Sequence, residues 1–255
     1  HSRRTAARDA AYFIPHIKPH FHILDIGCGP GTISADLAAL VPQGRVTCVE
    51  IAESALNAAR DPFSSRSVTN ADYVVGDVTT RLPFEDDSFD AVHLHMVIMH
   101  LPCDPIIALR EIRRVLKEGG VVGCKEMVMS TTRWFPVDKR LDVWEKGITG
   151  AILESGGSPD MGMGLKYAAL TAGFEDHQVK CAASPWCFSD TEAVQFFGDS
   201  CAERFKDGSE LRERTVKGGH ATADEVDDFI QACHDWKEKK GAWFGVMNGE
   251  LLAWK

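Results

Sequence analysis

The sequence predicts a doubly wound α/β fold built on a seven-stranded, mostly parallel sheet, the Rossmann-like arrangement with helices on both faces. In the first half of the chain, strand patterns and helix patterns alternate repeatedly, which is typical of parallel strands joined by crossover helices. A glycine-punctuated turn at residues 25–31 follows the first apolar strand, where such sheets bind their ligands. The chain of 255 residues can bury a full core as one domain.

The elements of the first half follow from their hydrophobic spacing. A helical pattern over residues 3–17, broken by Pro15, leads into the first strand. We expect strands at 21–26, 45–50, 73–76, 89–97 and 121–128, and helices at 31–41, 53–60 and 106–116. The sequence Lys-Glu-Gly-Gly at 117–120 ends the last of these helices.

The second half is less regular. Residues 130–158 show no clear period, and 160–172 read as a helix that stops at Gly173. We expect strands at 176–187 and 242–255, the latter split by a turn at Asn248-Gly249. Between them, residues 188–240 are charged and helical in pattern, as expected for an insertion before the last strand that covers the carboxyl edge of the sheet.

Composition narrows the function classes. The net charge of −9 and the pI near 5.6 argue against nucleic acid and anionic membranes as partners. The eight cysteines include no C-x-x-C pair and lie mostly in apolar runs, which predicts reduced, buried thiols and a cytoplasmic location. The histidine clusters lack zinc-site spacing, so no metal is expected. No run reaches the ~18–20 apolar residues of a membrane span and no signal peptide is visible, although a chain beginning at His1 leaves room for a preceding segment.

The turn itself reads Asp25-Ile26-Gly27-Cys28-Gly29-Pro30-Gly31. Glycines let the backbone pass close to a small ligand, and the following helix points free amides at it. A dinucleotide fingerprint would need a third glycine where Thr32 stands. The Asp-x-Gly-x-Gly-x-Gly pattern instead resembles class I methyltransferases, which use S-adenosylmethionine. That resemblance implies cofactor contacts from four residues of the turn: Asp25, Gly27, Cys28 and Gly29.

Two further acids follow the next two strands, where parallel strands bring their carboxyl ends together. Glu50 can accept both ribose hydroxyls, and Asp77, after Gly76, can accept the adenine amino group. Ile51 and Val78 supply apolar faces for the adenine ring. Each acid alone reads as a solvated strand end or a helix cap, but together they favour a cofactor.

Several later segments resemble the UbiE-like branch of the methyltransferases, which includes quinone-biosynthesis enzymes and many fungal natural-product enzymes. The match covers about residues 20–130 and rests on Leu82-Pro83-Phe84, Phe89-Asp90, His100-Leu101 and the run Leu109 to Gly120. The N-terminal residues 1–6 and the segment His93-Leu94-His95-Met96-Val97 look like the fungal secondary-metabolite group. Met96 stands where that group often has glutamine, and the insertion at 188–240 departs from the compact quinone enzymes.

Methyl transfer from a sulfonium is an in-line displacement that requires the nucleophile and the methyl group to be held ~3–3.5 Å apart, with water excluded. A base is optional. His95 and His100, at and just past the end of the fourth strand, are the candidate bases for a phenol or N-hydroxyl acceptor, whereas a packed, hydrogen-bonded strand histidine is the structural alternative. His95 is also expected to contact the cofactor, and residues 3–5 to reach its carboxylate.

Methionine and aromatic residues gather after the fifth strand and in the insertion. They predict an apolar pocket for a flat or hydrophobic acceptor. The expected lining residues are Met96, Met127, Trp134, Phe135, Trp186 and Phe197.

These features predict a single methyltransferase domain over residues 1–255, with an N-terminal helix in 1–20, a cofactor-binding core at 21–129 and a substrate cap at 188–240. The predicted activity is S-adenosylmethionine-dependent methylation of a small natural product, with O-methylation favoured, N-, C- and S-methylation open, and S-adenosylhomocysteine as the product. Three alternatives stay open: a quinone-pathway C-methyltransferase, a nicotinamide oxidoreductase, and an inactive cofactor-binding partner protein.

Overall fold

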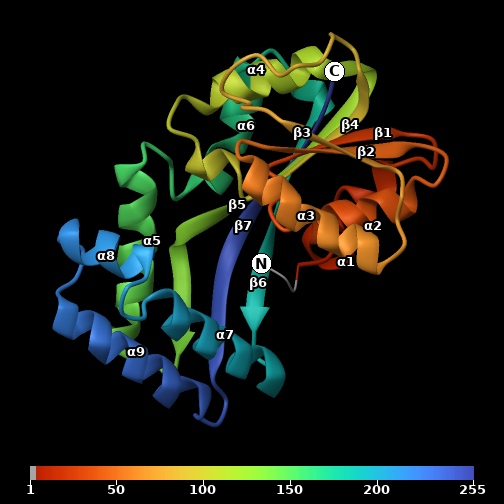
Figure 1. Ribbon diagram of the computed structural model, residues 1–255. Helices are drawn as coiled ribbons and strands as arrows, with labels where there is room; N and C mark the ends of the chain where they lie inside the picture. The colour runs from red at the N-terminus through yellow and green to blue at the C-terminus, as the bar shows by residue number, and fades with distance from the viewer. Residues whose placement is uncertain (1–3) are drawn as a thin grey trace. The chain divides into compact units, whose positions relative to one another are not determined.

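The computed structural model describes residues 4–255, and within them seven strands form one sheet in the order β3-β2-β1-β4-β5-β7-β6 (Figure 1). The strands are β1 (His22–Ile26), β2 (Arg45–Glu50), β3 (Ala71–Val75), β4 (Phe89–His95), β5 (Leu116–Phe135), β6 (Val179–Phe188) and β7 (Trp243–Trp254). Because β1 lies between β2 and β4, the strand order reverses there, and the predicted doubly wound sheet is confirmed.

The first five strands run parallel: β1 pairs with β2 and β4, β2 with β3, and β4 with β5. Figure 1 shows β7 running against β5. In agreement, Gly119 N donates to Lys255 O over 2.9 Å, so the end of β7 lies beside the start of β5. The carboxyl ends of the parallel strands therefore share one edge.

Helices cover both faces of this sheet. On one side lie α1 (Ala6–Asp9), α2 (Thr32–Leu40) and α3 (Glu53–Ser65), and on the other α4 (Pro105–Val115) and α6 (Met161–Thr171) (Figure 1). Helix α4 buries Leu109, Ile112 and Val115, which is the spacing of an amphipathic helix on a sheet. Short 3-10 turns lie at η1 (Ile14–His16), η2 (Ile98–His100), η3 (Lys139–Leu141) and η4 (Asp176–Gln178).

The chain forms two compact units, which we describe separately. The first comprises the chain up to Glu126 together with Met161–Ala182 and Gly249–Lys255, and the second comprises Met127–Asp160 and Ala183–Asn248. The helices of the second unit are α5 (Asp142–Glu154), α7 (Thr191–Arg204), α8 (Glu210–Lys217) and α9 (Ala223–Lys237). Residues 188–240 are thus helical, as their pattern predicts.

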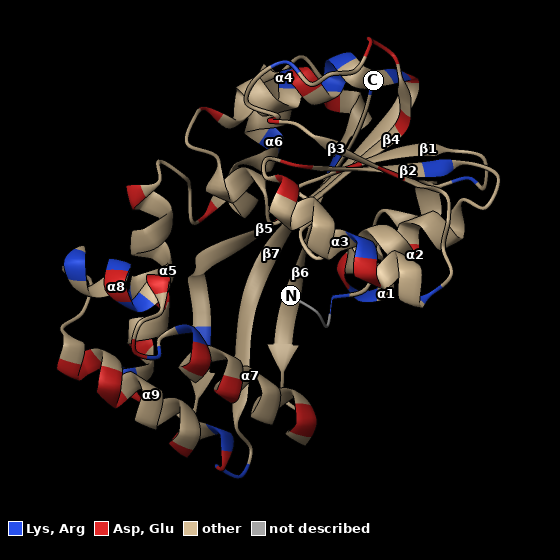
Figure 2. Cartoon of the chain, in the orientation of Figure 1, with Lys and Arg blue, Asp and Glu red and all other residues tan. Residues whose placement is uncertain are grey.

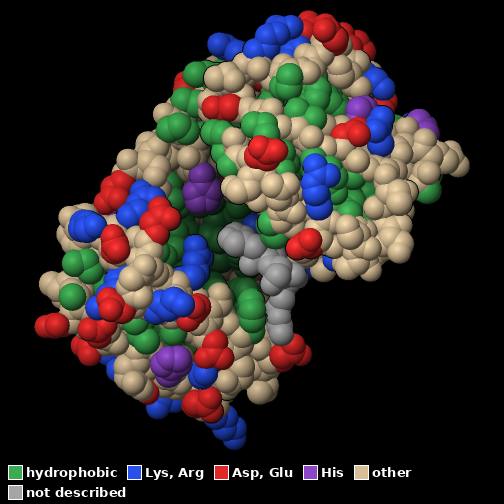
Figure 3. Space-filling model, viewed as in Figure 1, with side chains coloured by type: hydrophobic (Ala, Val, Ile, Leu, Met, Phe, Trp, Pro, Cys, Tyr) green, Lys and Arg blue, Asp and Glu red, His purple; other side chains and the backbone are tan. Residues whose placement is uncertain are grey.

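The second unit has an aromatic core of its own. The ring centroids of Phe197 and Phe244 lie 4.3 Å apart, and those of Trp134 and Phe244 4.6 Å apart. Trp144 and Trp236 pack edge-on against Trp134. Outside this core, acidic residues predominate along α7 and α9, whereas α8 carries both signs (Figure 2). Charges of both signs are interspersed with hydrophobic side chains on the face seen in Figure 3.

The N-terminal segment departs from the expected helix. Residues 1–3 of that prediction lie outside the described residues, and α1 is a single turn capped by the Thr5 side chain, which accepts from Arg8 N. Pro15 then falls in η1, because proline has no amide hydrogen to continue an α-helix. Phe13, fully buried, still ties the segment to the core.

The turn predicted at Asn248-Gly249 is wrong, because β7 continues through both residues. The Asn248 side chain is buried, and its Nδ2 donates to Ser184 O over 3.2 Å. A Cβ at position 249 would lie 1.9 Å from Gly162 O, so the glycine serves a close backbone approach rather than a turn.

Two other expectations change in detail. Strand β5 extends from Leu116 to Phe135, beyond the predicted 121–128. Four cysteines are buried as predicted, but Cys181 and Cys187 are exposed on β6. No helix within residues 4–255 is both long and apolar enough to cross a membrane.

Candidate cofactor and active site

The glycine turn after β1 is fixed by the neighbouring strand and helix. Its three glycines have φ of 65°, 54° and 72° at positions 27, 29 and 31, values in the left-handed region that favours glycine. Gly27 N donates to Val49 O over 2.9 Å. A Cβ at position 31 would lie 2.4 Å from Ala59 O, so the turn also lies against α3.

Glu50 ends β2 with its carboxylate beside this turn. Its Oε1 accepts from Gly29 N over 2.8 Å and its Oε2 from Ile51 N over 3.3 Å. A carboxylate has about four acceptor directions, so two amides leave capacity for the two hydroxyls of a ribose.

A cavity of about 330 Å³ extends from Glu50 across the ends of β2 and β3, where Ile51, Gly76, Asp77 and Val78 line it. Ile51 is 68% exposed, whereas Val78 is buried. One Asp77 oxygen, Oδ1, accepts from the amide and the hydroxyl of Thr79, and no described residue donates to the other. An exposed apolar side chain, a buried apolar wall and an available carboxylate oxygen suit a flat base with an amino group.

A second cavity, of about 260 Å³, adjoins the first, since Gly27, Glu50, Met96 and His100 line both. The other predicted cofactor residues that line it are Asp25, Cys28, Gly29 and His95, and Arg4 lines it too. The two cavities together collect all ten residues that the sequence assigns to the cofactor.

Asp25 is engaged by two protein groups. His93 faces it across β1 and β4, and the Nδ1 of His93 lies 2.7 Å from Asp25 Oδ1. The Ser34 hydroxyl donates to Oδ2. Asp25 is only 2% exposed, so its carboxylate holds His93 and Ser34 in place beneath the cavity. Sequence reasoning did not predict this pair, although strand register could have suggested it.

The two candidate bases have different surroundings. His95 is buried, and its ring stacks on His93 with centroids 6.5 Å apart and an interplanar angle of 6°. Burial, followed by the charge of Arg4, holds the pKa of His95 well below its usual value of 6.5, so the imidazole is neutral at physiological pH and can accept a proton. His100 is exposed at the end of η2.

Met96, the predicted acceptor contact in the first unit, lines both cavities in a left-handed backbone conformation with φ of 57°. Such conformations are costly for residues other than glycine and concentrate at functional sites. The unusual backbone conformation of Met96 thus coincides with its position on the walls of both cavities.

Glu126 on β5 is a site-associated residue that sequence reasoning missed. It is fully buried, and its carboxylate accepts from the amides of Val97, Ile98 and Met99 at 3.0, 2.7 and 3.3 Å. An acid inside an otherwise apolar strand is the signal that could have revealed it, because a buried carboxylate needs partners.

The remaining predicted acceptor contacts belong to the second unit. Trp134 and Phe197 pack in its aromatic core, Met127 is buried, Phe135 is 57% exposed, and Trp186 is partly buried. Their role with an acceptor stays a prediction.

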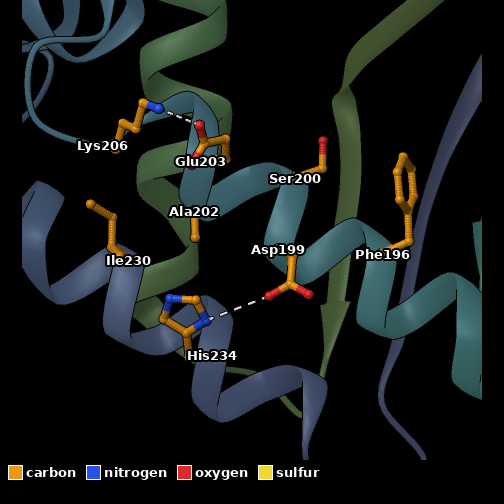
Figure 4. Close-up of a pocket in the computed structure, with 8 residues that line it drawn as sticks. All are labelled: Phe196, Asp199, Ser200, Ala202, Glu203, Lys206, Ile230 and His234. Atoms are coloured by element: carbon orange, nitrogen blue, oxygen red, sulfur yellow. Dashed lines mark hydrogen bonds and ion pairs between the residues drawn. The ribbon is translucent and has the colours of Figure 1, made fainter. Parts of the chain in front are cut away.

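A further cavity of about 540 Å³ lies between α7 and α9 (Figure 4). Lys206 pairs with Glu203 on its wall, and His234 Nδ1 lies 3.8 Å from Asp199 Oδ1. The predicted site residues do not line it.

The chain is similar to known methyltransferases. Residues 23–120 match the family described as methyltransferase domain. The chain is 29% identical over 258 residues to an uncharacterised methyltransferase of Schizosaccharomyces pombe, covering 99% of this chain and 91% of the relative. The matched domain and this relative support a class I methyltransferase. It is also 28% identical to ltbC of Aspergillus luteorubrus, named as a methyltransferase, covering 99% of this chain and 92% of the relative.

The UbiE-like resemblance has support as well. Over 119 residues the chain is 38% identical to demethylmenaquinone methyltransferase of Staphylococcus aureus, which spans 46% of each chain. That match is confined to part of each protein, whereas the two fungal relatives match over nearly their full length.

Solved structures share the fold. A Bacillus halodurans C-125 protein described as a methyltransferase aligns over 98% of this chain and 99% of its own, with a TM-score of 0.63 and 21% identity. Phosphoethanolamine N-methyltransferase 2 of Haemonchus contortus, solved with S-adenosylhomocysteine, aligns over 98% of this chain and 52% of its own, with a TM-score of 0.59 and 17% identity.

Proposed function

We propose that this methyltransferase transfers the methyl group of S-adenosylmethionine to the oxygen of a small, apolar or aromatic natural product. The observation that carries the proposal is that all ten predicted cofactor residues line two adjoining cavities at the carboxyl edge of the sheet. S-adenosylmethionine supplies an activated methyl group on a sulfonium, and S-adenosylhomocysteine is the expected product.

The chain's own residues hold the cofactor from two sides. Glu50 accepts the ribose hydroxyls, Asp77 accepts the adenine amino group, and Ile51 and Val78 cover the faces of the base. At the other end, Arg4 lines the cavity beside His95, where its charge suits the carboxylate of the methionine moiety.

His95 and His100 are proposed to act at the acceptor. His95 is neutral, buried and on the cavity wall, so it can take the proton of a phenol or an N-hydroxyl while the acceptor oxygen attacks in line. His100, exposed beside both cavities, can orient the acceptor or exchange the proton with solvent. Most of the rate gain is expected from positioning and water exclusion.

A quinone-pathway C-methyltransferase is the second candidate, favoured by the 38% identity to demethylmenaquinone methyltransferase. The helical segment 188–240 argues against it, because the partial match leaves that half of the chain unaccounted for. An inactive cofactor-binding protein is the third.

Two measurements test the proposal. Calorimetry with S-adenosylhomocysteine and with a nicotinamide dinucleotide asks which cofactor binds. Deuterium-labelled methyl donor, offered with panels of phenols, N-hydroxyls, amines, thiols and quinols, then reports by mass spectrometry which atom is methylated. Binding of the nicotinamide cofactor alone would refute the proposal, and methylation of quinol carbon alone would favour the second candidate.

A further inference from the structure

The carboxylate of Glu126 is the common partner of three successive backbone amides. The two shorter contacts, 3.0 Å from Val97 N and 2.7 Å from Ile98 N, both reach Oε1, and Met99 N reaches Oε2 over 3.3 Å. These are amides at the start of η2 (Ile98–His100), which have no partner within a helix. A side chain from β5 therefore caps this turn from a distant part of the sequence.

The turn held in this way forms one wall of both cavities. Met96 and His100 line the two cavities, and Val97 lines the larger. Val97 also lies against the glycine turn, because a Cβ at position 27 would come within 2.5 Å of its Cγ2. Position 96 is fixed further by the bond from its amide to Lys125 O over 2.9 Å.

We propose that ionised Glu126 is the positioning residue that holds segment 96–100 in the arrangement that binds the cofactor, so that protonation of Glu126 weakens cofactor binding. This inference rests on the proposed function. It assigns Glu126 no contact with the cofactor, and it makes the charge of one buried side chain a determinant of the site.

The ionisation state of Glu126 changes in the physiological range. Burial raises the pKa of Glu126 to about 7, against the opposing effect of the three amides. Facing it are the Cys124 thiol on the same strand, 3.6 Å away, and the Tyr12 phenol, whose pKa its charge helps to raise. Lys125, next in sequence, pairs instead with Glu250, and no described residue forms an ion pair with Glu126.

Protonation removes one acceptor. A carboxylic acid carries its proton on one oxygen, and the oxygen with the longer single contact, Oε2, is the better site for it. The bond from Met99 N is then lost, and those to Oε1 weaken because the charge is gone.

The test is the pH dependence of S-adenosylhomocysteine binding to the full chain, measured by calorimetry. If only the ionised form binds, a pKa of about 7 makes the affinity about tenfold weaker at pH 6 than at pH 8, and binding at pH 6.5 releases protons that appear as a dependence of the heat on the buffer. Glu126→Gln should bind about tenfold more weakly at pH 8, the loss of one charge-assisted bond, and should lose this pH-dependent component.

A matched variant serves as the control. Glu118→Gln makes the same change at an exposed position of the same strand and should keep the wild-type profile.

The outcomes separate the inference from the proposed function. If wild-type protein binds no S-adenosylhomocysteine at any pH, the proposed function fails. If it binds with pH-independent affinity, or if Glu126→Gln keeps the wild-type profile, the inference alone is overturned. Should Glu126→Gln fail to fold, amide hydrogen exchange in the wild-type protein tests the inference instead. After correction for intrinsic rates, amides 97–99 should be less protected at pH 6 than at pH 8. Equal protection at the two pH values would overturn the inference.

Discussion

Replacement of Glu50 by alanine is the sharpest test of the cofactor site. The carboxylate already accepts Gly29 N at 2.8 Å, and its remaining acceptor directions are those we assign to the ribose. Loss of a single charge-assisted hydrogen bond costs about 1.5–3 kcal/mol, which corresponds to an affinity for S-adenosylhomocysteine about 10- to 150-fold weaker.

The assay is calorimetry of wild-type protein, Glu50→Ala, Glu50→Gln and Glu53→Ala. The glutamine variant keeps a neutral acceptor for Gly29 and should lose less affinity than the alanine variant. Glu53 is exposed at the start of α3, so Glu53→Ala should bind S-adenosylhomocysteine with wild-type affinity. Binding of Glu50→Ala within twofold of wild type, with unchanged thermal stability, would refute the assignment of Glu50 to the ribose.

Four further predictions concern other residues of the chain. His95→Ala and His100→Ala should lower turnover across the pH range if either residue is the base, and full activity in both would leave positioning as the mechanism. Burial holds the pKa of His95 below 6.5 in the folded state, so below that pH the unfolded chain binds one proton more than the folded chain. The free energy of unfolding should therefore fall as the pH drops below 6.5. Denaturant titrations at several pH values should show a smaller decline for His95→Gln. Gly31→Ala should lower the stability of the protein more than Gly29→Ala. Both substitutions carry a left-handed penalty of about 1 kcal/mol, but only a Cβ at position 31 would clash with a neighbour. Equal losses of stability on thermal unfolding would contradict the close approach of the turn to α3. Trp134→Ala should cost about 3–5 kcal/mol of stability by denaturant unfolding, and a loss below 1 kcal/mol would show that this ring is not core.

The positions of the cofactor residues were predictable because they follow from topology alone. Once three strands are parallel, the residues that end them must meet at one edge, and Glu50 and Asp77 do line the same cavity. Elements with a clear period, such as β2 at Arg45–Glu50, were predicted to the residue.

The contacts that sequence reasoning missed are between residues far apart in the chain. Glu126 meets Val97 only because β5 lies beside β4, and Asp25 meets His93 only through the register of β1 and β4. The turn expected at Asn248-Gly249 was wrong for a similar reason. Its local preference for a turn is overridden by a hydrogen bond from Asn248 to β6 and by the close approach of Gly249 to the backbone of α6.

The glycine turn between β1 and α2 has a consequence for the thermodynamics of binding. Val49 O, Glu50 and Ala59 hold it from two neighbouring elements of the protein itself. A loop already in its bound shape loses little conformational freedom when a ligand arrives. Cofactor association should therefore be fast and nearly free of a reorganisation step at this turn, and the entropic cost should concentrate in exposed side chains such as Ile51.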